Sequence, residues 1–133
     1  MLYQLPVVSL SEANLHGVEL HGANLQGADL ASAELSEAVL IDADLRSAVL
    51  SAATLRDANL STGSDDRTDT NLTNADLKLA NLSDTNLRDA EGVTKDELEE
   101  QADSLQGATM PDGQKYEDWI KDKEGRKEDG ENG

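Results

Sequence analysis

The chain has 133 residues, a length that suits one domain, and its 28 acidic and 11 basic residues leave a net charge of −17. Cysteine is absent, which excludes disulfides and thiolate metal sites. No apolar run approaches the length of a membrane span, and the N-terminus lacks the basic and apolar regions of a signal peptide. We therefore expect a soluble, cytoplasmic protein that does not contact a membrane.

The main feature of the sequence is a leucine at every fifth position from Leu10 to Leu60. A small apolar residue, Ala or Val, stands two positions before each of these leucines. The same frame returns from Leu72 to Leu87, with Ala or Thr as the small residue. A period of five fits neither the repeat of a helix nor that of a strand. It indicates a short supersecondary unit that stacks as a solenoid.

The repeated unit A-[ND]-L-x-x, as in residues 13–17, 23–27 and 28–32, resembles the pentapeptide repeat family. The match covers roughly residues 8–90. The resemblance implies an all-β fold, a right-handed quadrilateral β-helix in which four pentapeptides make one coil, and hence about four coils. It also implies that the leucine and the small residue point inward, where each buried leucine contributes about 2 kcal/mol. The other three positions face solvent.

The repeats divide the chain into predicted segments. Residues 1–9 are too apolar for a free tail, so we expect them to cap the open first coil, with a hydrophobic dimer contact as the alternative. Residues 10–92 are the predicted β-helix, with a surface loop at 61–71. The spacing of 12 from Leu60 to Leu72 is interpreted as one degenerate frame plus two extra residues.

This interpretation of the loop sets the register of the coils. With one frame skipped, the loop interrupts one of the four inward leucine stacks. The loop itself is either a partner-binding element or a tolerated insertion. The predicted stacks are Leu10/Leu30/Leu50/Leu72, Leu15/Leu35/Leu55/Leu77, Leu20/Leu40/Leu60/Leu82 and the interrupted Leu25/Leu45/Leu87.

Residues 93–123 are predicted to form a C-terminal cap region with a short helix. Thr94 and Glu97 have the spacing of a capping box, which places the helix at about 95–104. We expect this helix to lie over the last coil. The residues that it should bury are Leu98, Ala102 and Leu105.

The end of the chain carries charge and glycine with little to bury. Residues 124–133 are therefore predicted to be a disordered acidic tail.

The repeats offer no convergent chemistry for catalysis. His16 and His21 occupy the same outward position in successive frames, so they lie on adjacent faces and do not chelate a metal together. The many Ser and Thr residues have no neighbouring histidine to activate them. We therefore expect no catalytic residues, no metal and no cofactor, and a protein that is not an enzyme.

Acidic charge is the feature that favours a function. Residues 1–92 hold 15 acidic and 5 basic residues, about one net charge per 2 Å of rod, close to the one per about 1.7 Å of duplex DNA. Some members of the pentapeptide repeat family are DNA mimics that bind DNA gyrase. The resemblance thus implies an alternative function, an acidic DNA mimic aimed at gyrase or another topoisomerase. Four coils are short for such a mimic, and acidic charge also keeps a rod soluble without any partner.

Our main hypothesis is a non-enzymatic scaffold, monomer or homodimer, whose outer faces mediate a protein–protein interaction. The partner is unknown; we expect it to present a basic surface, and we expect no direct contact with nucleic acid because like charges repel. The alternative interpretation of each candidate contact residue is an ordinary solvent-exposed side chain that has no partner. The candidate partner-binding residues are Glu19, Asp29, Glu34, Asp42, Asp44 and Asp57.

Overall fold

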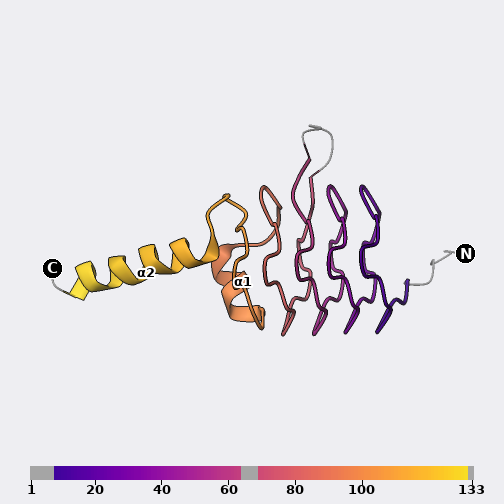
Figure 1. The fold of residues 1–133 in the computed structure, drawn as a ribbon, viewed down its shortest axis with the longest axis horizontal. Helices are drawn as coiled ribbons and strands as arrows, with labels where there is room; N and C mark the ends of the chain where they lie inside the picture. The colour runs from indigo at the N-terminus through magenta and orange to yellow at the C-terminus, as the bar shows by residue number, and fades with distance from the viewer. Residues whose placement is uncertain (1–7, 64–68, 132–133) are drawn as a thin grey trace, which may run out of the picture.

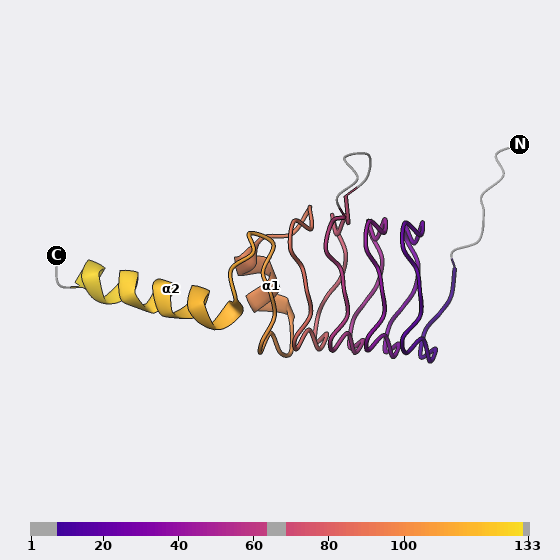
Figure 2. The same ribbon diagram turned by 45° about the horizontal axis from the view of Figure 1, so that its top comes forward.

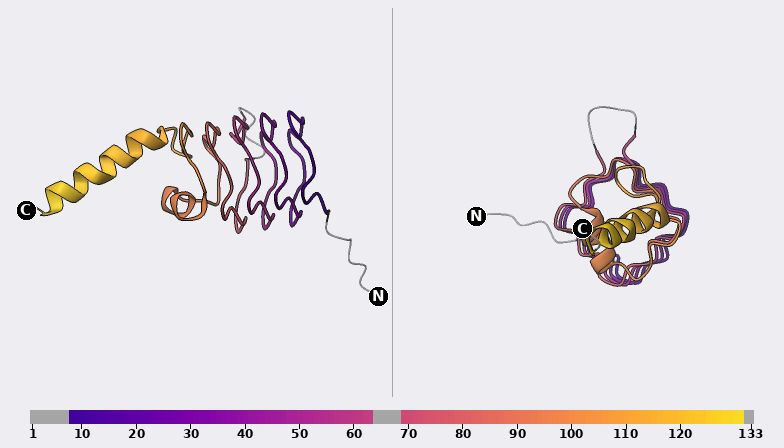
Figure 3. Two further views of the ribbon diagram at one scale, coloured as in Figure 1. Left: turned by 60° about the horizontal axis from the view of Figure 1, so that its bottom comes forward. Right: turned by 90° about the vertical axis from the view of Figure 1, so that its left-hand side faces the viewer.

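The computed structural model describes residues 8–63 and 69–131, which form a stack of coils and two helices near the C-terminal end (Figure 1). Parallel single-residue β-bridges join each coil to the next, as between Asn14 and Glu34 and between Glu34 and Thr54. Four pentapeptides therefore complete one coil. Along the axis of the solenoid the coils superimpose in a four-sided outline (Figure 3). Of the predicted N-terminal cap, residues 1–7 lie outside the described residues.

Each pentapeptide forms a turn that residues close to it in the sequence stabilise. In the pentapeptide around Leu40, the backbone N–H of Ala43 donates to the carbonyl of Leu40 at 3.1 Å. Asp42, inside this turn, has a left-handed φ of 59°, a conformation in which Asp is several-fold enriched. In the next frame, the Asp44 side chain accepts from the Arg46 N–H at 3.1 Å. Where an Asn or Asp stands directly before the leucine, as Asp44 does, its side chain thus stabilises the corner.

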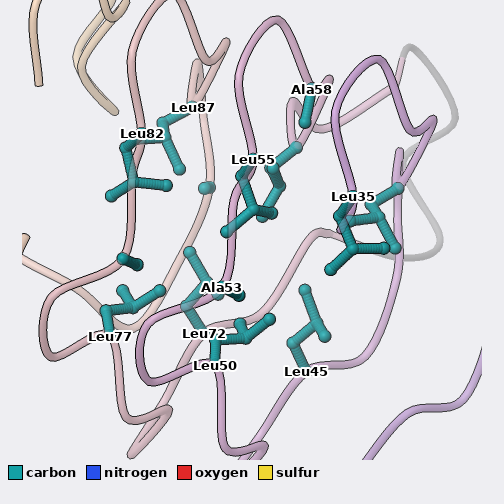
Figure 4. Packing of buried hydrophobic residues seen from close by; sticks show 14 of the residues in the cluster. Leu35, Leu45, Leu50, Ala53, Leu55, Ala58, Leu72, Leu77, Leu82 and Leu87 are labelled. Carbon is teal, nitrogen blue, oxygen red and sulfur yellow. The ribbon is translucent and has the colours of Figure 1, made fainter. Parts of the chain in front are cut away.

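The inward leucines form one continuous core, as expected. Those from Leu25 to Leu60 and from Leu72 to Leu87 are buried, and Figure 4 shows leucines of successive coils pointing into a common interior. Leu15 and Leu20 are only half-buried. Both belong to the first coil, which has a neighbouring coil on one side only among the described residues, so these two leucines keep part of their contact with solvent.

The predicted register beyond the loop is wrong by one face. Asp44 bridges Asn71 and Val49 bridges Asp76, so Leu72 stacks on Leu45 and not on Leu50. Leu60 and Leu72 occupy consecutive faces, and the spacing of 12 is one pentapeptide plus seven inserted residues. The observed stacks, which define faces 1 to 4 in this order, are Leu10/Leu30/Leu50/Leu77, Leu15/Leu35/Leu55/Leu82, Leu20/Leu40/Leu60/Leu87 and Leu25/Leu45/Leu72.

Buried polar contacts join the two ends of the coil between which the insertion lies. Thr70 takes the small inward position before Leu72 and is fully buried. Its hydroxyl accepts from the Asp42 N–H and donates to the Ser61 carbonyl, both at 2.8 Å. The Asp42 carboxylate accepts from the Gly63 N–H at 2.7 Å. The core therefore continues past the insertion, whose centre, residues 64–68, lies outside the described residues.

Replacing Thr70 by Val is expected to lower the free energy of unfolding by about 1–3 kcal/mol, because the isosteric side chain leaves the buried Asp42 N–H without its acceptor. Thr70→Ser, which keeps the hydroxyl, is the control and should lose less. Urea unfolding followed by circular dichroism measures both. A Val variant as stable as the parent would contradict the role of this hydroxyl.

The first helix, α1, spans Lys95–Gln101 and begins as predicted, with the Thr94 side chain accepting from the Glu97 N–H. It ends earlier than the expected 95–104 because the coil resumes directly afterwards, where Ser104 bridges Asn81. The helix therefore takes the place of face 1 in a partial fifth coil.

The placement of α1 in the fifth coil corrects the prediction that it lies over the last coil. Leu98 and Leu105 are buried, whereas Ala102 is only partly buried. The side-chain oxygen of Gln101 accepts from the Leu77 N–H at 3.0 Å. This side chain supplies the acceptor that the next coil supplies on the other faces.

The second helix, α2, spans Tyr116–Glu131 and projects from the end of the solenoid (Figures 1 and 2). Its buried Trp119 packs on the core. Lys123 lies 3.1 Å from both Asp96 and Glu99 of α1 and anchors the helix there. The tail predicted to be disordered from residue 124 is thus helical to Glu131, in a segment rich in the helix formers Lys, Glu and Arg. Neither of these two helices is long and apolar enough to span a bilayer.

Candidate protein-binding surface

The six acidic residues predicted to contact a partner do not form one surface. Asp29 lies on face 1 and Asp44 on face 4. Of the six, only Glu19 on face 3 and Asp57 on face 2 are well exposed. The other four are half-buried or buried. The six residues therefore spread over all four faces, and most of them are engaged within the chain.

Three of these carboxylates stabilise their own corners. Asp29 accepts from the Ala31 N–H at 3.1 Å, and Glu34 accepts from the Ser36 N–H at 2.9 Å. The Ser36 side chain and backbone lower the pKa of Glu34. The Asp44 carboxylate accepts hydrogen bonds from Nε and Nη2 of Arg46, at 2.9 and 2.7 Å. This pairing lowers the pKa of Asp44. These carboxylates already have donors, which makes them poor candidates for partner contact.

Asp42 is buried, with 6% of its surface exposed, which contradicts the expectation that this position faces solvent. Its carboxylate holds Gly63 at the insertion and lies 3.3 Å from Nε2 of His21. His16 likewise lies 3.7 Å from Glu37 in the next coil. Each histidine pairs with a carboxylate one coil further on. Among residues 8–63 and 69–131, no group of three potential metal-ligating side chains comes together.

A different set of acids forms a column that the sequence analysis largely missed. Glu37, Asp57 and Asp84 occupy the same corner position, after face 2, in three successive coils. All three are exposed and have left-handed φ values of 61°, 58° and 56°. We call Glu37, Asp57 and Asp84 the acidic edge. Of these three acids only Asp57 is among the predicted contact residues, and the predicted register placed Asp84 in the column of Asp42 instead of the column of Asp57.

The acidic edge presents charge at a regular spacing. Successive coils are about 4.8 Å apart, and two unit charges at that distance repel each other by about 1 kcal/mol in water. Because their backbone is held in a tight turn, the three carboxylates cannot move far apart. A cationic surface that met all three would relieve this repulsion.

A family model described as pentapeptide repeats matches the chain in eight copies, over residues 8–31, 23–61 and 68–91. The chain belongs to the pentapeptide repeat family. The matched segments end at residue 61 and resume at 68, which agrees with an insertion between two otherwise consecutive pentapeptides. The resemblance noted in the sequence is therefore confirmed.

Solved structures place this pentapeptide repeat protein among known folds. One is a pentapeptide repeat protein of the Arabidopsis thaliana thylakoid lumen, with 23% identity and a TM-score of 0.57, covering 76% of this chain and 60% of that one. Another is HetL of the cyanobacterium Nostoc, a pentapeptide repeat protein involved in the regulation of heterocyst differentiation. It shows 31% identity and a TM-score of 0.53, covering 81% of this chain and 60% of HetL.

These neighbours imply the right-handed quadrilateral β-helix for this pentapeptide repeat protein. The chain spans about 60% of the length of each of the two structures. A search of curated proteins finds no match to it.

Proposed function

We propose that this pentapeptide repeat protein is a non-enzymatic scaffold that binds another protein, and that the acidic edge is its main contact. The observation that carries the proposal is the column of three exposed carboxylates, Glu37, Asp57 and Asp84, one coil apart on a rigid corner. The partner is a protein with a basic surface that matches this spacing.

Rigid presentation favours such a contact. The corner positions are fixed by the coil hydrogen bonds on either side, as where the Asp57 N–H donates to the Ser83 carbonyl at 3.1 Å. Little backbone freedom is then lost on binding, which is a main cost of association. The net charge of −17 steers a cationic partner toward the protein, and salt should weaken the complex.

The alternative of a DNA mimic that binds gyrase needs a longer run of charges than the acidic edge provides. Three carboxylates along two coil steps span about 10 Å, or roughly one charge per 3–5 Å. This spacing is close to that of a single DNA strand, which carries one charge per about 3.4 Å, but the edge is only about three phosphates long. The short length of the edge favours the scaffold over the mimic.

The test of the proposal removes the three charges of the edge in the variant Glu37→Gln, Asp57→Asn, Asp84→Asn. The amides keep the side-chain size, and Asn tolerates the left-handed backbone, so folding should be intact. Immobilised protein should capture a specific set of partners, and the edge variant should capture them about tenfold less, as the loss of a few charge pairs predicts.

The matched control removes three scattered acids, in Glu12→Gln, Asp89→Asn, Asp103→Asn, and changes the net charge equally. This control should still capture the partners. Equal capture by the two variants would contradict the acidic edge. Inhibition of gyrase supercoiling that is lost in the edge variant would favour the mimic.

A further inference from the structure

Leu79 is an unusual residue for the position it occupies. Its φ is 60°, in the left-handed region, and 67% of its surface is exposed. A bulky side chain in this region is an outlier, and residues with such strained backbone cluster at functional sites. Every other described non-glycine residue with a left-handed φ is short or polar. These residues are Glu12, Ser32, Glu37, Asp42, Ser47, Ala52, Asp57, Asn74, Asp84 and Asp89.

Opposite charges flank this leucine. A hollow of about 360 Å³ beside it is lined by Lys78, Leu79, Glu100 and Gln101. Lys78 and Glu100 are exposed, and neither forms an ion pair with a residue that the structure describes. We call these four residues the Leu79 patch. An apolar residue that shares a hollow with a cation and an anion, neither of them paired with a described residue, has the pattern of a surface that is complementary to itself.

We propose that the Leu79 patch binds a second copy of this chain around a two-fold axis. Leu79 of each copy packs against the leucine of the other at the axis. Lys78 of one copy then meets Glu100 of the second, and Glu100 meets Lys78. Charge complementarity supports a second copy as the occupant. Two chains of net charge −17 repel each other over most of their surface. At this patch, in contrast, the proposed arrangement places a cation of each chain opposite an anion of the other.

The expected dimer is weak and depends on concentration. The patch contains four residues from one corner and one short helix, and contacts well below the standard interface of about 1,600 Å² are transient. Association should therefore be measured over a series of high protein concentrations. An ionic strength of about 0.15 M screens the net charge beyond about 8 Å but not ion pairs in direct contact.

The deciding experiment mixes two charge-reversed variants in sedimentation velocity. Lys78→Glu alone places two anions opposite each other, and Glu100→Lys alone places two cations opposite each other. Each variant should associate at least about tenfold less than the parent. The mixture of both should regain the association, because each mixed dimer restores both opposite-charge contacts. A mixture that remains monomeric, or single variants that dimerise like the parent, would overturn the proposal.

A second pair of variants separates association from folding. Leu79→Asn removes the apolar centre and introduces a residue that favours the left-handed backbone, so the melting temperature should hold or rise while the dimer is lost. Ser47→Asn introduces the same residue at another left-handed corner, where φ is 59°, and should leave association unchanged. Undiminished dimers of Leu79→Asn, or a partner protein that replaces the second copy at this patch, would contradict the inference.

Discussion

Replacing Leu40 by Ala is expected to lower the free energy of unfolding by about 2–5 kcal/mol, the range for large-to-small changes in a packed core. Leu40 has no exposed surface and lies in the middle of its stack, between Leu20 and Leu60. The narrow interior of a coil leaves no side chain that can shift to fill the cavity. Urea unfolding followed by circular dichroism gives the difference in free energy.

The control for Leu40→Ala is the same change in the same stack at the open end. Leu20 is half-buried in the first coil, so Leu20→Ala should cost less than half as much. In a stacked repeat, stability is a sum of coil terms and contacts between neighbouring coils. A central substitution weakens contacts on two sides and a terminal one on a single side. Equal losses at the two positions would contradict this account of the core.

Gly92→Ala should be the most damaging small change in the C-terminal part of the solenoid. Gly92 follows the last regular frame and has a φ of 84°. A Cβ atom at this position would overlap the hydroxyl and the backbone nitrogen of Thr73. Overpacking costs about 1–3 kcal/mol, and the left-handed backbone adds about 1–2 kcal/mol for a residue with a Cβ. We expect Gly92→Ala to lower the free energy of unfolding by about 2–5 kcal/mol in total.

Gly27→Ala is the matched control for Gly92→Ala. Its φ is 70°, but a Cβ atom there would have no neighbour within 4 Å. The only loss in the free energy of unfolding should therefore be the cost of a left-handed backbone at a residue with a Cβ atom, about 1–2 kcal/mol. Because the chain has a single tryptophan, the buried Trp119, its fluorescence reports whether the C-terminal end loosens. Equal losses for the two glycines would show that the contact with Thr73 does not matter.

The sequence by itself determined the features that depend on residues close together in the chain. A leucine every five residues with a small residue two positions earlier requires a narrow stacked coil. Thr94 and Glu97 define a helix start within four residues, and the structure has this start. Such features need no knowledge of distant segments, because local hydrogen bonds and the inward period already select them.

Only the tertiary structure decided how distant segments meet. A spacing of 12 between Leu60 and Leu72 fits either one skipped frame with two extra residues or no skipped frame with seven. The second solution is the one found, and it keeps every buried leucine stacked on another. The burial of Asp42 and the place of Asp84 in the column of Glu37 and Asp57 follow from this register, so a local pattern could not predict them. The same holds for α1, which replaces one face because Gln101 and Leu98 meet Leu77 and the core only after the coils have stacked.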